Sequence, residues 1–450
     1  MSVQASSVDP TRSRTSRRHV LKLGGAIALG SALPAGQIPW VHAGENNTIR
    51  LALIGCGGRG RGAVGDAFSV ASGPIQLYAL ADLTEDRVAM SRKVLQNHLG
   101  DRATVPEDRC FVGLDAYRHA IDSLRPGDIA MLTAYAFCRP QQIEYAVSKG
   151  VHVFMEKTFA PDPAGCHRIL AAGEAAKEAN LKIAAGLQCR HSVARQALID
   201  KIRAGELGEI QKVRATRVCG GGFLAVPPDN VDHVLWQIHN RMHFLWASAG
   251  ILLEMLIHQI DECCWIMDGW PVSATGKGNR SDRPDNCSQN FEHYDIEYSF
   301  DGGGKALVES VQPFATFIHG SKRAAQFSGD VHRATVHTYQ GHEVDNAQID
   351  WAAEREPRGP WQAQWKNFLE AIYEDRPFNE TDRAIKANLA SIMGRAAAHM
   401  GRTVTWQEVI DSRFAFAPQV DELKIGGPAP VQPDAEGNYP FPVPGQWVEI

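Results

Sequence analysis

The sequence predicts an α/β protein: an N-terminal domain with a parallel sheet, then a second α/β domain with a large, mostly antiparallel open sheet. Three observations predict this fold. Short apolar runs alternate with helical segments over residues 49–185, which is typical of a doubly wound sheet. From residue 210 onward, strand patterns predominate. The 450 residues, of which 44% are hydrophobic and 22% are charged, suffice for two domains that each bury a core.

Residues 1–43 are interpreted as a twin-arginine signal peptide. Arg17 and Arg18 precede an apolar stretch over residues 23–33, which is too short to span a bilayer. Val41 and Ala43 are then the small residues that a signal peptidase requires. We therefore expect a periplasmic protein, exported after folding, with no membrane span in its mature part. The alternative is a disordered basic N-terminus.

The charge balance disfavours nucleic acid as a partner. The net charge is −5, and residues 1–43 contain five basic residues and one acidic residue. The mature chain therefore has 41 basic and 50 acidic residues, a net charge of −9. Such a chain binds nucleic acid poorly, and we expect a small, neutral or weakly charged substrate.

The nine cysteines include no CxxC pair, which indicates buried thiols rather than disulfides or a zinc site.

The N-terminal domain, expected over residues 44–165, begins with a glycine-rich turn. Residues 49–54 are an apolar run of the buried-strand type. They lead into Gly55-Cys56-Gly57-Gly58-Arg59-Gly60, which matches GxGxxG and opens a helical pattern. A second strand over residues 75–81 ends at Asp82, 22 residues past the last glycine. This combination is the fingerprint of a Rossmann domain that binds a dinucleotide.

The residues of the fingerprint have separate physical roles. Gly55 permits the tight turn, Gly57 lets the backbone approach the pyrophosphate, and Gly60 lets the helix pack closely on the strand. The helix N-terminus offers free N–H groups to the phosphates. The Asp82 carboxylate would accept hydrogen bonds from ribose hydroxyls and repel a 2′-phosphate, so NAD is expected, whereas the nearby Arg87 leaves NADP possible. The alternative is a glycine turn without a nucleotide.

Strands and helices continue to alternate after Asp82. The sequence predicts a strand over residues 128–134, a helix over 140–149 and a strand over 151–155. Ligands bind doubly wound sheets at the carboxyl ends of the strands. Lys157 follows such an end directly, so we expect it to face the crevice where a nicotinamide would lie. The alternative is a solvated lysine.

The second domain is expected over residues 166–420, followed by an extended tail over 421–450. Strand patterns over residues 210–218, 294–300 and 305–312 predict a largely antiparallel open sheet. Helices cover one face of such a sheet and the other face often serves association, so we expect a homo-oligomer. The tail contains six prolines and little periodicity, which is typical of a segment that wraps the body or reaches a neighbouring subunit.

In a helix predicted over residues 250–265, the apolar run over residues 250–261 is interrupted by three ionisable residues. Glu254, His258 and Asp261 follow one another at spacings of four and three, which places them on one helix face. Buried charges need partners, so this stripe indicates a wet cleft in which Glu254 could tune His258 for proton transfer. The alternatives are a structural ion pair or a metal site. No further ligand set is evident, and we expect no metal.

An aromatic and polar segment precedes this helix. Residues 236–241 and 243–246 alternate aromatic with polar side chains. Aromatic faces and arginine donors are the groups that often bind sugars. The alternative is a well-packed loop.

These motifs together resemble the Gfo/Idh/MocA family (glucose–fructose oxidoreductase, inositol dehydrogenase and MocA). The resemblance covers residues 47–406 and rests on strand–GxGxxG–helix, on Asp82, on Glu156-Lys157 at a strand end, and on Glu254-x-x-x-His258-x-x-Asp261. It extends to exported, twin-arginine-directed members, which carry a Phe-x-Arg-Pro-like stretch, here Phe137-Cys138-Arg139-Pro140. The family fold joins a Rossmann domain to an α/β domain with a large open sheet.

The resemblance implies oxidation or reduction of secondary alcohols on sugars or cyclitols with NAD(P). The implied catalytic residues are Lys157, His258 and Glu254. The implied cofactor-binding residues are Gly55, Gly57, Gly58, Gly60, Asp82, Glu156 and Lys157. The implied substrate-binding residues are Arg190, His191 and Asp261. The sequence departs from the family pattern at Thr158, at Glu254, at Cys189 and at Ala249, where proline, aspartate, arginine and glycine are usual.

Three functions follow from this reading. The first is hydride transfer at a carbinol carbon, with His258 as general base and Lys157 stabilising the developing charge on oxygen. The second is an NAD-dependent glycosidase, which oxidises a ring hydroxyl transiently, eliminates the aglycone, adds water and reduces the sugar again. The third is a non-catalytic nucleotide-binding protein. Because no free NAD pool is expected outside the cytoplasm, we expect a tightly bound cofactor.

Overall fold

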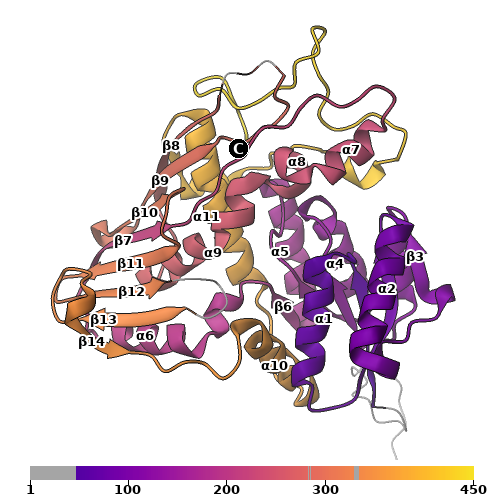
Figure 1. The fold of residues 1–450 in the computed structure, drawn as a ribbon, viewed down its shortest axis with the longest axis horizontal. Coiled ribbons are helices and arrows are strands. Elements are labelled where there is room, and N and C mark those ends of the chain that lie inside the picture. Colours follow the sequence, from indigo (N-terminus) through magenta and orange to yellow (C-terminus); the bar gives the residue numbers. More distant parts are fainter. Residues whose placement is uncertain (1–46, 282, 284, 329–333) are drawn as a thin grey trace, which may run out of the picture. The chain divides into compact units, whose positions relative to one another are not determined.

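The computed structural model describes residues 47–450, except residues 282, 284 and 329–333. The predicted signal peptide over residues 1–43 lies outside these described residues. Two sheets organise the described chain (Figure 1). The predicted fold class is confirmed, because one sheet is parallel and the other is mostly antiparallel.

The first sheet has six parallel strands in the order β3-β2-β1-β4-β5-β6. The strands are β1 (Ile49–Ile54), β2 (Ile75–Asp82), β3 (Cys110–Val112), β4 (Ile129–Leu132), β5 (His152–Met155) and β6 (Ile183–Ala185). The helices between them are α1 (Gly58–Val70), α2 (Glu85–Leu99), α3 (Ala116–Asp122), α4 (Arg139–Ser148) and α5 (Pro163–Glu178). The strand order reverses between β1 and β4, which opens a crevice at the carboxyl ends of these two strands.

Two features of this sheet differ from a simple reading of the sequence. The helix α1 begins at Gly58, inside the glycine motif, although glycine disfavours helix; close packing on β1 outweighs that propensity. The strand β6 joins the sheet well after residue 165, where the sequence placed the boundary of the N-terminal domain. That boundary stays a prediction.

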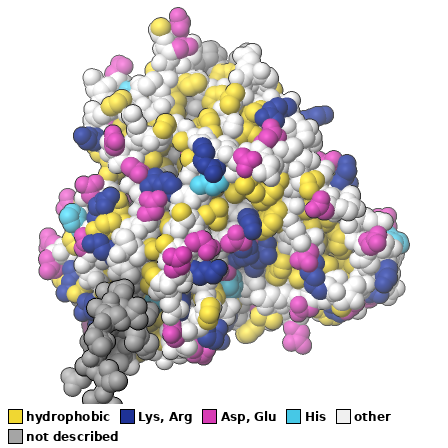
Figure 2. All heavy atoms as spheres, turned by 180° about the vertical axis from the view of Figure 1, so that it is seen from behind, with side chains coloured by type: hydrophobic (Ala, Val, Ile, Leu, Met, Phe, Trp, Pro, Cys, Tyr) yellow, Lys and Arg dark blue, Asp and Glu magenta, His cyan; other side chains and the backbone are white. Residues whose placement is uncertain are grey.

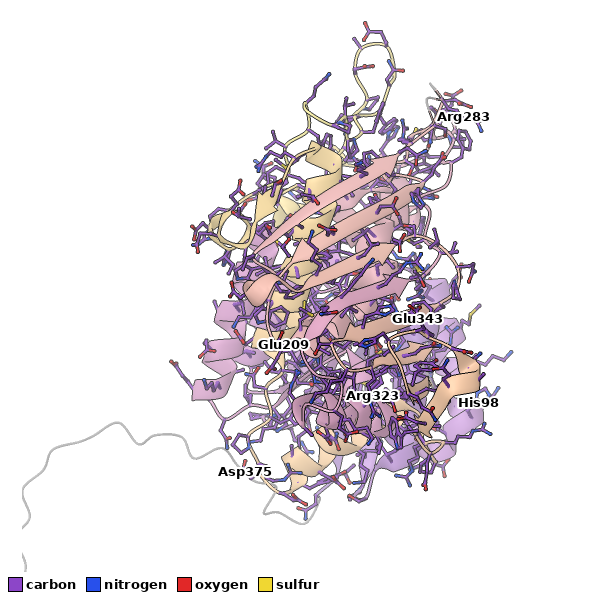
Figure 3. The ribbon with its side chains drawn as sticks, turned by 90° about the vertical axis from the view of Figure 1, so that its left-hand side faces the viewer. His98, Glu209, Arg283, Arg323, Glu343 and Asp375 are labelled. Carbon is purple, nitrogen blue, oxygen red and sulfur yellow. The ribbon has the colours of Figure 1, made fainter. Side chains whose placement is uncertain are left out.

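The second sheet has nine strands in the order β14-β13-β12-β11-β7-β10-β9-β8-β15. Among the strand pairs that the structure describes in this second sheet, only β7 and β10 run parallel to each other. The strands are β7 (Ile210–Thr216), β8 (Ser273–Asn279), β9 (His293–Ser299), β10 (Lys305–Glu309), β11 (Ala315–Gly320), β12 (Ala324–Ser328), β13 (Thr335–Tyr339), β14 (Ile349–Ala352) and β15 (Val404–Thr405). Figure 3 looks onto these strands.

Helices cover one face of the second sheet. The helices α9 (Gly250–Met267) and α11 (Thr381–Met400) pack on its strands. Along β9 the side chains alternate: Tyr294, Ile296 and Tyr298 are buried, and the residues between them are half-buried, as expected for a strand with one covered face. The remaining helices are α6 (Val193–Arg203), α7 (His233–His239), α8 (Leu245–Ser248), α10 (Pro360–Tyr373) and α12 (Trp406–Asp411).

The described residues have charged side chains on the surface and cysteines in the interior. Basic and acidic side chains are intermixed on the face shown in Figure 2. All nine cysteines are free thiols, and all except Cys110 are buried, as the cysteine pattern predicted. No helix in the described part of the chain has both the length and the apolar character needed to cross a bilayer.

Candidate active site

The glycine turn between β1 and α1 has the geometry that the motif predicts. Gly55 has a φ of +101°, and a Cβ there would lie 2.6 Å from the carbonyl carbon of Thr133. A Cβ on Gly60 would lie 2.6 Å from the Thr133 hydroxyl and closer still to the Gly55 carbonyl oxygen. Only glycine fits these two positions, because the turn crosses the end of β4 and α1 packs directly on the turn.

The other two glycines of the turn face open space. A Cβ on Gly57 would meet only the Arg87 guanidinium, at 3.9 Å, and a Cβ on Gly58 would meet nothing within 4 Å. No side chain caps the N-terminus of α1, and its first turn holds no acidic residue. The free N–H groups and the positive end of the helix dipole therefore face this space, as a bound pyrophosphate requires.

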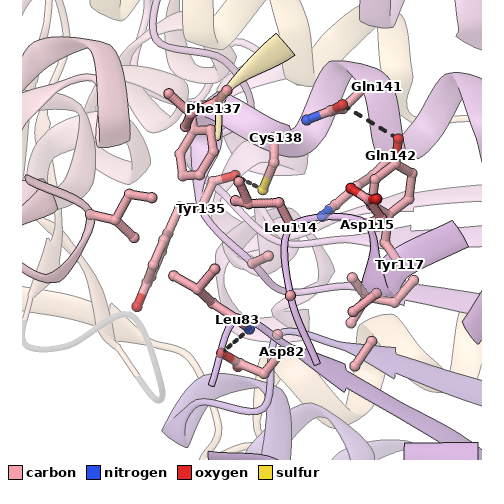
Figure 4. A pocket seen from close by; sticks show the side chains of 18 of the residues that line it. Asp82, Leu83, Leu114, Asp115, Tyr117, Tyr135, Phe137, Cys138, Gln141 and Gln142 are labelled. Carbon is pink, nitrogen blue, oxygen red and sulfur yellow. Dashed lines mark hydrogen bonds between the residues drawn. The ribbon is translucent and has the colours of Figure 1, made fainter. Parts of the chain in front are cut away.

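A cavity extends from this turn along the carboxyl ends of the strands (Figure 4). The Asp82 carboxylate lines it and is held at both oxygens, by the backbone N–H groups of Cys56 at 2.6 Å and Leu83 at 2.7 Å. A carboxylate oxygen can accept more than one hydrogen bond, so Asp82 remains able to bind ribose hydroxyls. The residues present thus fit a dinucleotide, and we call this space the nucleotide cavity.

The start of the C-terminal tail also lines the nucleotide cavity. Val420, Asp421 and Leu423 face it from across the strand ends. The Asp421 carboxylate is paired with Arg168 at 2.9 Å, which ties this part of the tail to α5. The sequence indicated a tail that wraps the body or reaches a neighbour, without indicating this place.

A second cavity, of about 280 Å³, adjoins the first. Thr133, Ala134 and Tyr135, from the loop after β4, line both. The remaining residues that line the second cavity are Arg59, Ala136, Glu156, Lys157, Thr158, Gln188, Arg241, Glu254, His258 and Trp361. Lys157 comes from the end of β5, whereas Glu254 and His258 come from α9. The structure therefore brings the three predicted catalytic residues together, and we call this space the catalytic cavity.

Lys157 is held by Glu254. Its ammonium donates to the Glu254 backbone carbonyl at 2.6 Å and to the Glu254 carboxylate at 3.1 Å. Both side chains are about 20% exposed, so the pair faces the cavity. The sequence suggested that Glu254 would tune His258. In the structure Glu254 instead bonds to Lys157, which lies just after β5, and helical spacing cannot reveal a partner from another element.

His258 is 5% exposed and lines the catalytic cavity. Its Nδ1 is buried and has no hydrogen-bond partner among the described residues. Burial lowers the pKa of His258 well below its ordinary value of 6.5, and the charge of Lys157 lowers it further. The imidazole is therefore unprotonated at neutral pH and can accept a proton from a substrate.

Arg59 connects the glycine motif to the catalytic cavity. Its Nε donates to Glu156 at 2.6 Å, its Nη1 contacts Asp66 at 3.3 Å, and its guanidinium lies 4.8 Å from the Trp361 ring centre. Its Nη2 is buried without a partner in the described chain. Sequence reasoning missed Arg59 and Trp361 as site residues. Arg59 occupies a variable position of GxGxxG, and Trp361 lies in the first turn of α10, about three hundred residues further on.

The three predicted substrate-binding residues line neither cavity. Asp261 is 1% exposed and pairs with Arg190 at 2.8 Å and Arg383 at 3.5 Å. His191 contacts the Glu380 carboxylate at 3.0 Å. Burial raises the pKa of Glu380, but the charges of Arg383 and His191 outweigh it and lower the pKa to about 2. These residues form a buried ionic network behind the catalytic cavity, and their contact with substrate stays a prediction.

Residues of the aromatic and polar segment, 236–246, have different roles in the structure. Trp246 is buried and donates its Nε1–H to Gln237 at 2.8 Å, so this part is packing, whereas Arg241 lines the catalytic cavity. Among the described residues, no group of three His, Cys, Asp or Glu side chains is arranged to hold a metal ion.

Comparisons with known proteins are consistent with this geometry. No family model matches the chain. A curated relative, a "Glycosyl hydrolase family 109 protein" from Solibacter usitatus, is 26% identical over 206 residues. That match spans 44% of this chain and 44% of the relative, which is less than half of either protein.

Two solved structures share the fold over most of the chain. An aldose-aldose oxidoreductase from Caulobacter crescentus superposes with a TM-score of 0.61 at 19% identity, covering 80% of this chain and 99% of that one. A myo-inositol 2-dehydrogenase from Lactobacillus plantarum does so with a TM-score of 0.58 at 18% identity, with the same coverage. Both are Gfo/Idh/MocA-type oxidoreductases. The resemblance is therefore supported at the level of the fold: the described chain shares with these oxidoreductases a fold that has one parallel sheet and one mostly antiparallel sheet.

Proposed function

We propose that the protein is an NAD(P)-dependent oxidoreductase that transfers hydride at a secondary alcohol of a sugar, glycoside or cyclitol. The observation that carries this proposal is the junction of the two cavities at Thr133, Ala134 and Tyr135. The nucleotide cavity fits a dinucleotide, and the adjoining cavity holds an ammonium group and an unprotonated imidazole. The names of the structural neighbours, an aldose-aldose oxidoreductase and an inositol dehydrogenase, support the same class of reaction.

The residues of the catalytic cavity have complementary roles in this reaction. NAD(P), when bound, supplies the hydride acceptor or donor. His258 takes the proton of the substrate hydroxyl, because burial keeps its imidazole unprotonated. The Lys157 ammonium donates a hydrogen bond to the same oxygen and stabilises negative charge there as the carbonyl forms. Glu254 positions Lys157 through the 3.1 Å ion pair.

Asp82 supports NAD as the preferred cofactor. Its carboxylate stands at the end of β2 and would lie beside a 2′-phosphate, which it repels. Arg87 lines the same cavity and keeps NADP as the second choice. We propose that either nucleotide is held tightly, because the beginning of the tail lies across the cavity from the glycine turn.

The released nucleotide is the first test of this function. Protein purified from its own export route is denatured, and the supernatant is assayed by absorbance and mass. We expect near-stoichiometric NAD. An empty site that binds NAD only weakly would contradict the tightly held cofactor.

A second measurement tests catalysis. Reduction or oxidation of the bound nucleotide is followed by absorbance across a panel of sugars and cyclitols, for the wild type and for Lys157→Met. We expect the variant to lose about 10²–10⁴-fold in rate, because it retains the aliphatic stem and loses the ammonium group. Lys149→Met is the matched control, because Lys149 is exposed outside both cavities. Full nucleotide loading without turnover would instead indicate a non-catalytic nucleotide-binding protein.

A glycosidase is the second candidate function, favoured by the name of the curated relative. In that reaction a ring hydroxyl is oxidised, the aglycone is eliminated, water adds, and the sugar is reduced again. The same two side chains would serve the oxidation and reduction steps. Release of aglycone without net NADH indicates the glycosidase, whereas net NADH indicates the dehydrogenase.

We also propose that the protein is exported to the periplasm and forms a homo-oligomer. Twin-arginine export to the periplasm would require a folded protein that carries its cofactor with it, which suits a tightly held nucleotide. A homo-oligomer remains our expectation from the open sheet. Cell fractionation with and without Arg17→Lys and Arg18→Lys tests the first point, and light scattering tests the second.

A further inference from the structure

Besides Tyr135, six ionisable side chains line the catalytic cavity, and their charges do not cancel. They are Arg59, Glu156, Lys157, Arg241, Glu254 and His258. Arg59 pairs with Glu156 at 2.6 Å and also with Asp66, which does not line the cavity, at 3.3 Å. Lys157 pairs with Glu254 at 3.1 Å. His258 is unprotonated because it is buried. One positive charge therefore remains in the cavity, that of Arg241.

The Arg241 guanidinium has no ion pair and no hydrogen bond with any residue that the structure describes, although it lines the cavity. It lies over the ring of Tyr135, with its central carbon 4.2 Å from the ring centre. Stacking leaves the guanidinium edges free to donate. Tyr135 lines both cavities, so Arg241 stands near their junction.

The backbone that carries Arg241 is firmly held. The Arg241 carbonyl accepts hydrogen bonds from the Ser248 hydroxyl at 3.0 Å and from the Phe244 N–H at 3.1 Å. The next carbonyl, that of Met242, accepts a hydrogen bond from Asn290 at 2.6 Å. The guanidinium is thus presented from a fixed turn, as a preorganised binding group requires.

From these contacts we infer that the substrate carries an anionic group, a carboxylate or a phosphate ester, that Arg241 binds. Planar arginine donors match the paired oxygens of such groups. A neutral sugar that filled the cavity would desolvate the Arg241 charge without compensating it, which is costly, whereas an acidic sugar would neutralise it. The inference rests on the proposed function, because it names the class of sugar that the same site oxidises or reduces.

This local charge opposes that of the whole chain. A mature chain of net charge −9 repels anions at a distance. Close to the cavity, the unpaired arginine dominates, because short-range interactions in a desolvated site are screened little by water or salt. The whole-chain charge therefore does not decide the charge of the substrate.

A phosphate of the bound cofactor is the other source of an anion for Arg241. The glycine turn, where the pyrophosphate is expected, lines the nucleotide cavity through Gly55 and Gly57, whereas Arg241 lines only the catalytic cavity. This placement favours the substrate. The experiment separates the two sources by measuring nucleotide affinity and sugar affinity on the same variant.

The test is calorimetric binding of paired sugars to nucleotide-loaded protein. D-glucuronate and D-galacturonate, and the phosphate esters of glucose and galactose, are compared with D-glucose and D-galactose. We expect at least one acid to bind about tenfold or more tightly than its neutral partner. Arg241→Gln should remove this preference while NAD affinity stays unchanged, and Arg241→Lys should retain part of it. Arg283→Gln, which removes an arginine stacked on Phe223 outside both cavities, should behave like the wild type.

Each other outcome overturns the inference. Neutral sugars that bind as tightly as the acids would do so, and so would a preference that survives in Arg241→Gln or a failure of every acid to bind. Weakened NAD binding with unchanged sugar binding would assign Arg241 to the cofactor. Because binding is measured without turnover, a failure of the proposed redox function is distinguishable: the acids would bind through Arg241 and none would be oxidised or reduced.

Discussion

His258 owes its chemistry to burial rather than to its own helix. Its spacing from Glu254 suggested a tuned pair, yet Glu254 is bonded to Lys157 and the imidazole is buried, with no partner for Nδ1 among the described residues. Burial disfavours the imidazolium, and the neighbouring Lys157 charge disfavours it further. Glu254, His258 and Asp261 share one helix face but have three different environments. Glu254 pairs with Lys157, His258 is buried with an unpartnered Nδ1 in the described chain, and Asp261 pairs with Arg190.

The lowered pKa of His258 predicts the acid side of the pH profile. A base that is already unprotonated does not gain activity as the pH rises through 6.5, the ordinary histidine value. We expect kcat/KM for the oxidised alcohol to stay level as the pH falls through 6.5 and to decline only well below it. Folding stability should also decrease as the pH falls below 6.5, because the unfolded chain takes up the proton first.

Steady-state rates measured across this pH range, with circular dichroism at each pH to exclude unfolding, check the profile. An acid limb with an apparent pKa at or above 6.5 would show that His258 is not the base or is not desolvated in the working enzyme.

Among the single elements, the turn before α1 and the start of α1 contain the GxGxxG motif, and two of its glycines are required by close packing. The glycines at positions 55 and 60 are required by close approach of backbone to backbone, whereas Gly57 lines the nucleotide cavity and Gly58 has open space around it. The motif predicted all four, because their roles are set within one strand–turn–helix unit. Lys157 was predictable for the same reason, as the end of a parallel strand always faces the ligand crevice.

Two glycines of α1 should therefore respond differently to alanine. We expect Gly60→Ala to lower the free energy of unfolding by about 1–3 kcal/mol and to weaken NAD binding, because the new methyl group would press on the Gly55 carbonyl and the Thr133 hydroxyl. Gly65→Ala, in the same helix but with nothing within 4 Å of its Cβ, should be neutral or stabilise by up to about 1 kcal/mol. Urea denaturation and nucleotide titration measure both; equal stability of the two variants would refute the packing argument.

Across the whole molecule, the end of the chain is anchored in the interior. Glu449, the penultimate residue, is fully buried and contacts Arg395 at 2.8 Å and His399 at 2.9 Å. Arg395 also donates to the Ala249 carbonyl at 2.8 Å, at the start of α9. The tail therefore holds Arg395 of α11, which in turn contacts the start of the helix that carries His258.

Removing the Glu449 charge should destabilise the fold strongly. We expect Glu449→Gln to cost about 3–5 kcal/mol of unfolding free energy, because Arg395 would be left buried without its counter-charge. Glu436→Gln, in an exposed part of the tail, is the matched control and should change stability by less than about 0.5 kcal/mol. Urea denaturation of both variants checks this difference, and similar losses would contradict the anchoring role.

The same residue predicts acid sensitivity. Burial raises the pKa of Glu449, but the charges of Arg395 and His399 outweigh it and lower the pKa from 4.5 to about 2. A carboxylate whose pKa is lowered on folding contributes stability above 4.5 and loses that contribution as the pH falls toward 2. The wild type should lose stability across this interval more steeply than Glu449→Gln, as thermal melts over that interval would show.

The sequence by itself determined the features that depend on neighbouring residues. These are the parallel sheet, the nucleotide turn with Asp82, the position of Lys157 at a strand end and the buried helix with His258. Each follows from local spacing, because strand, turn and helix periodicities fix which side chains share a face or an end.

Only the tertiary structure decided which distant residues meet. It paired Glu254 with Lys157, placed Asp261 in an ionic network with Arg190 and Arg383, and brought Arg241 and Trp361 to the catalytic cavity. At this site, segments separated by up to about three hundred residues meet, as Arg59 and Trp361 do. Their geometry depends on how the two sheets and their covering helices pack, and side-chain packing of that kind leaves no periodic signal in the sequence.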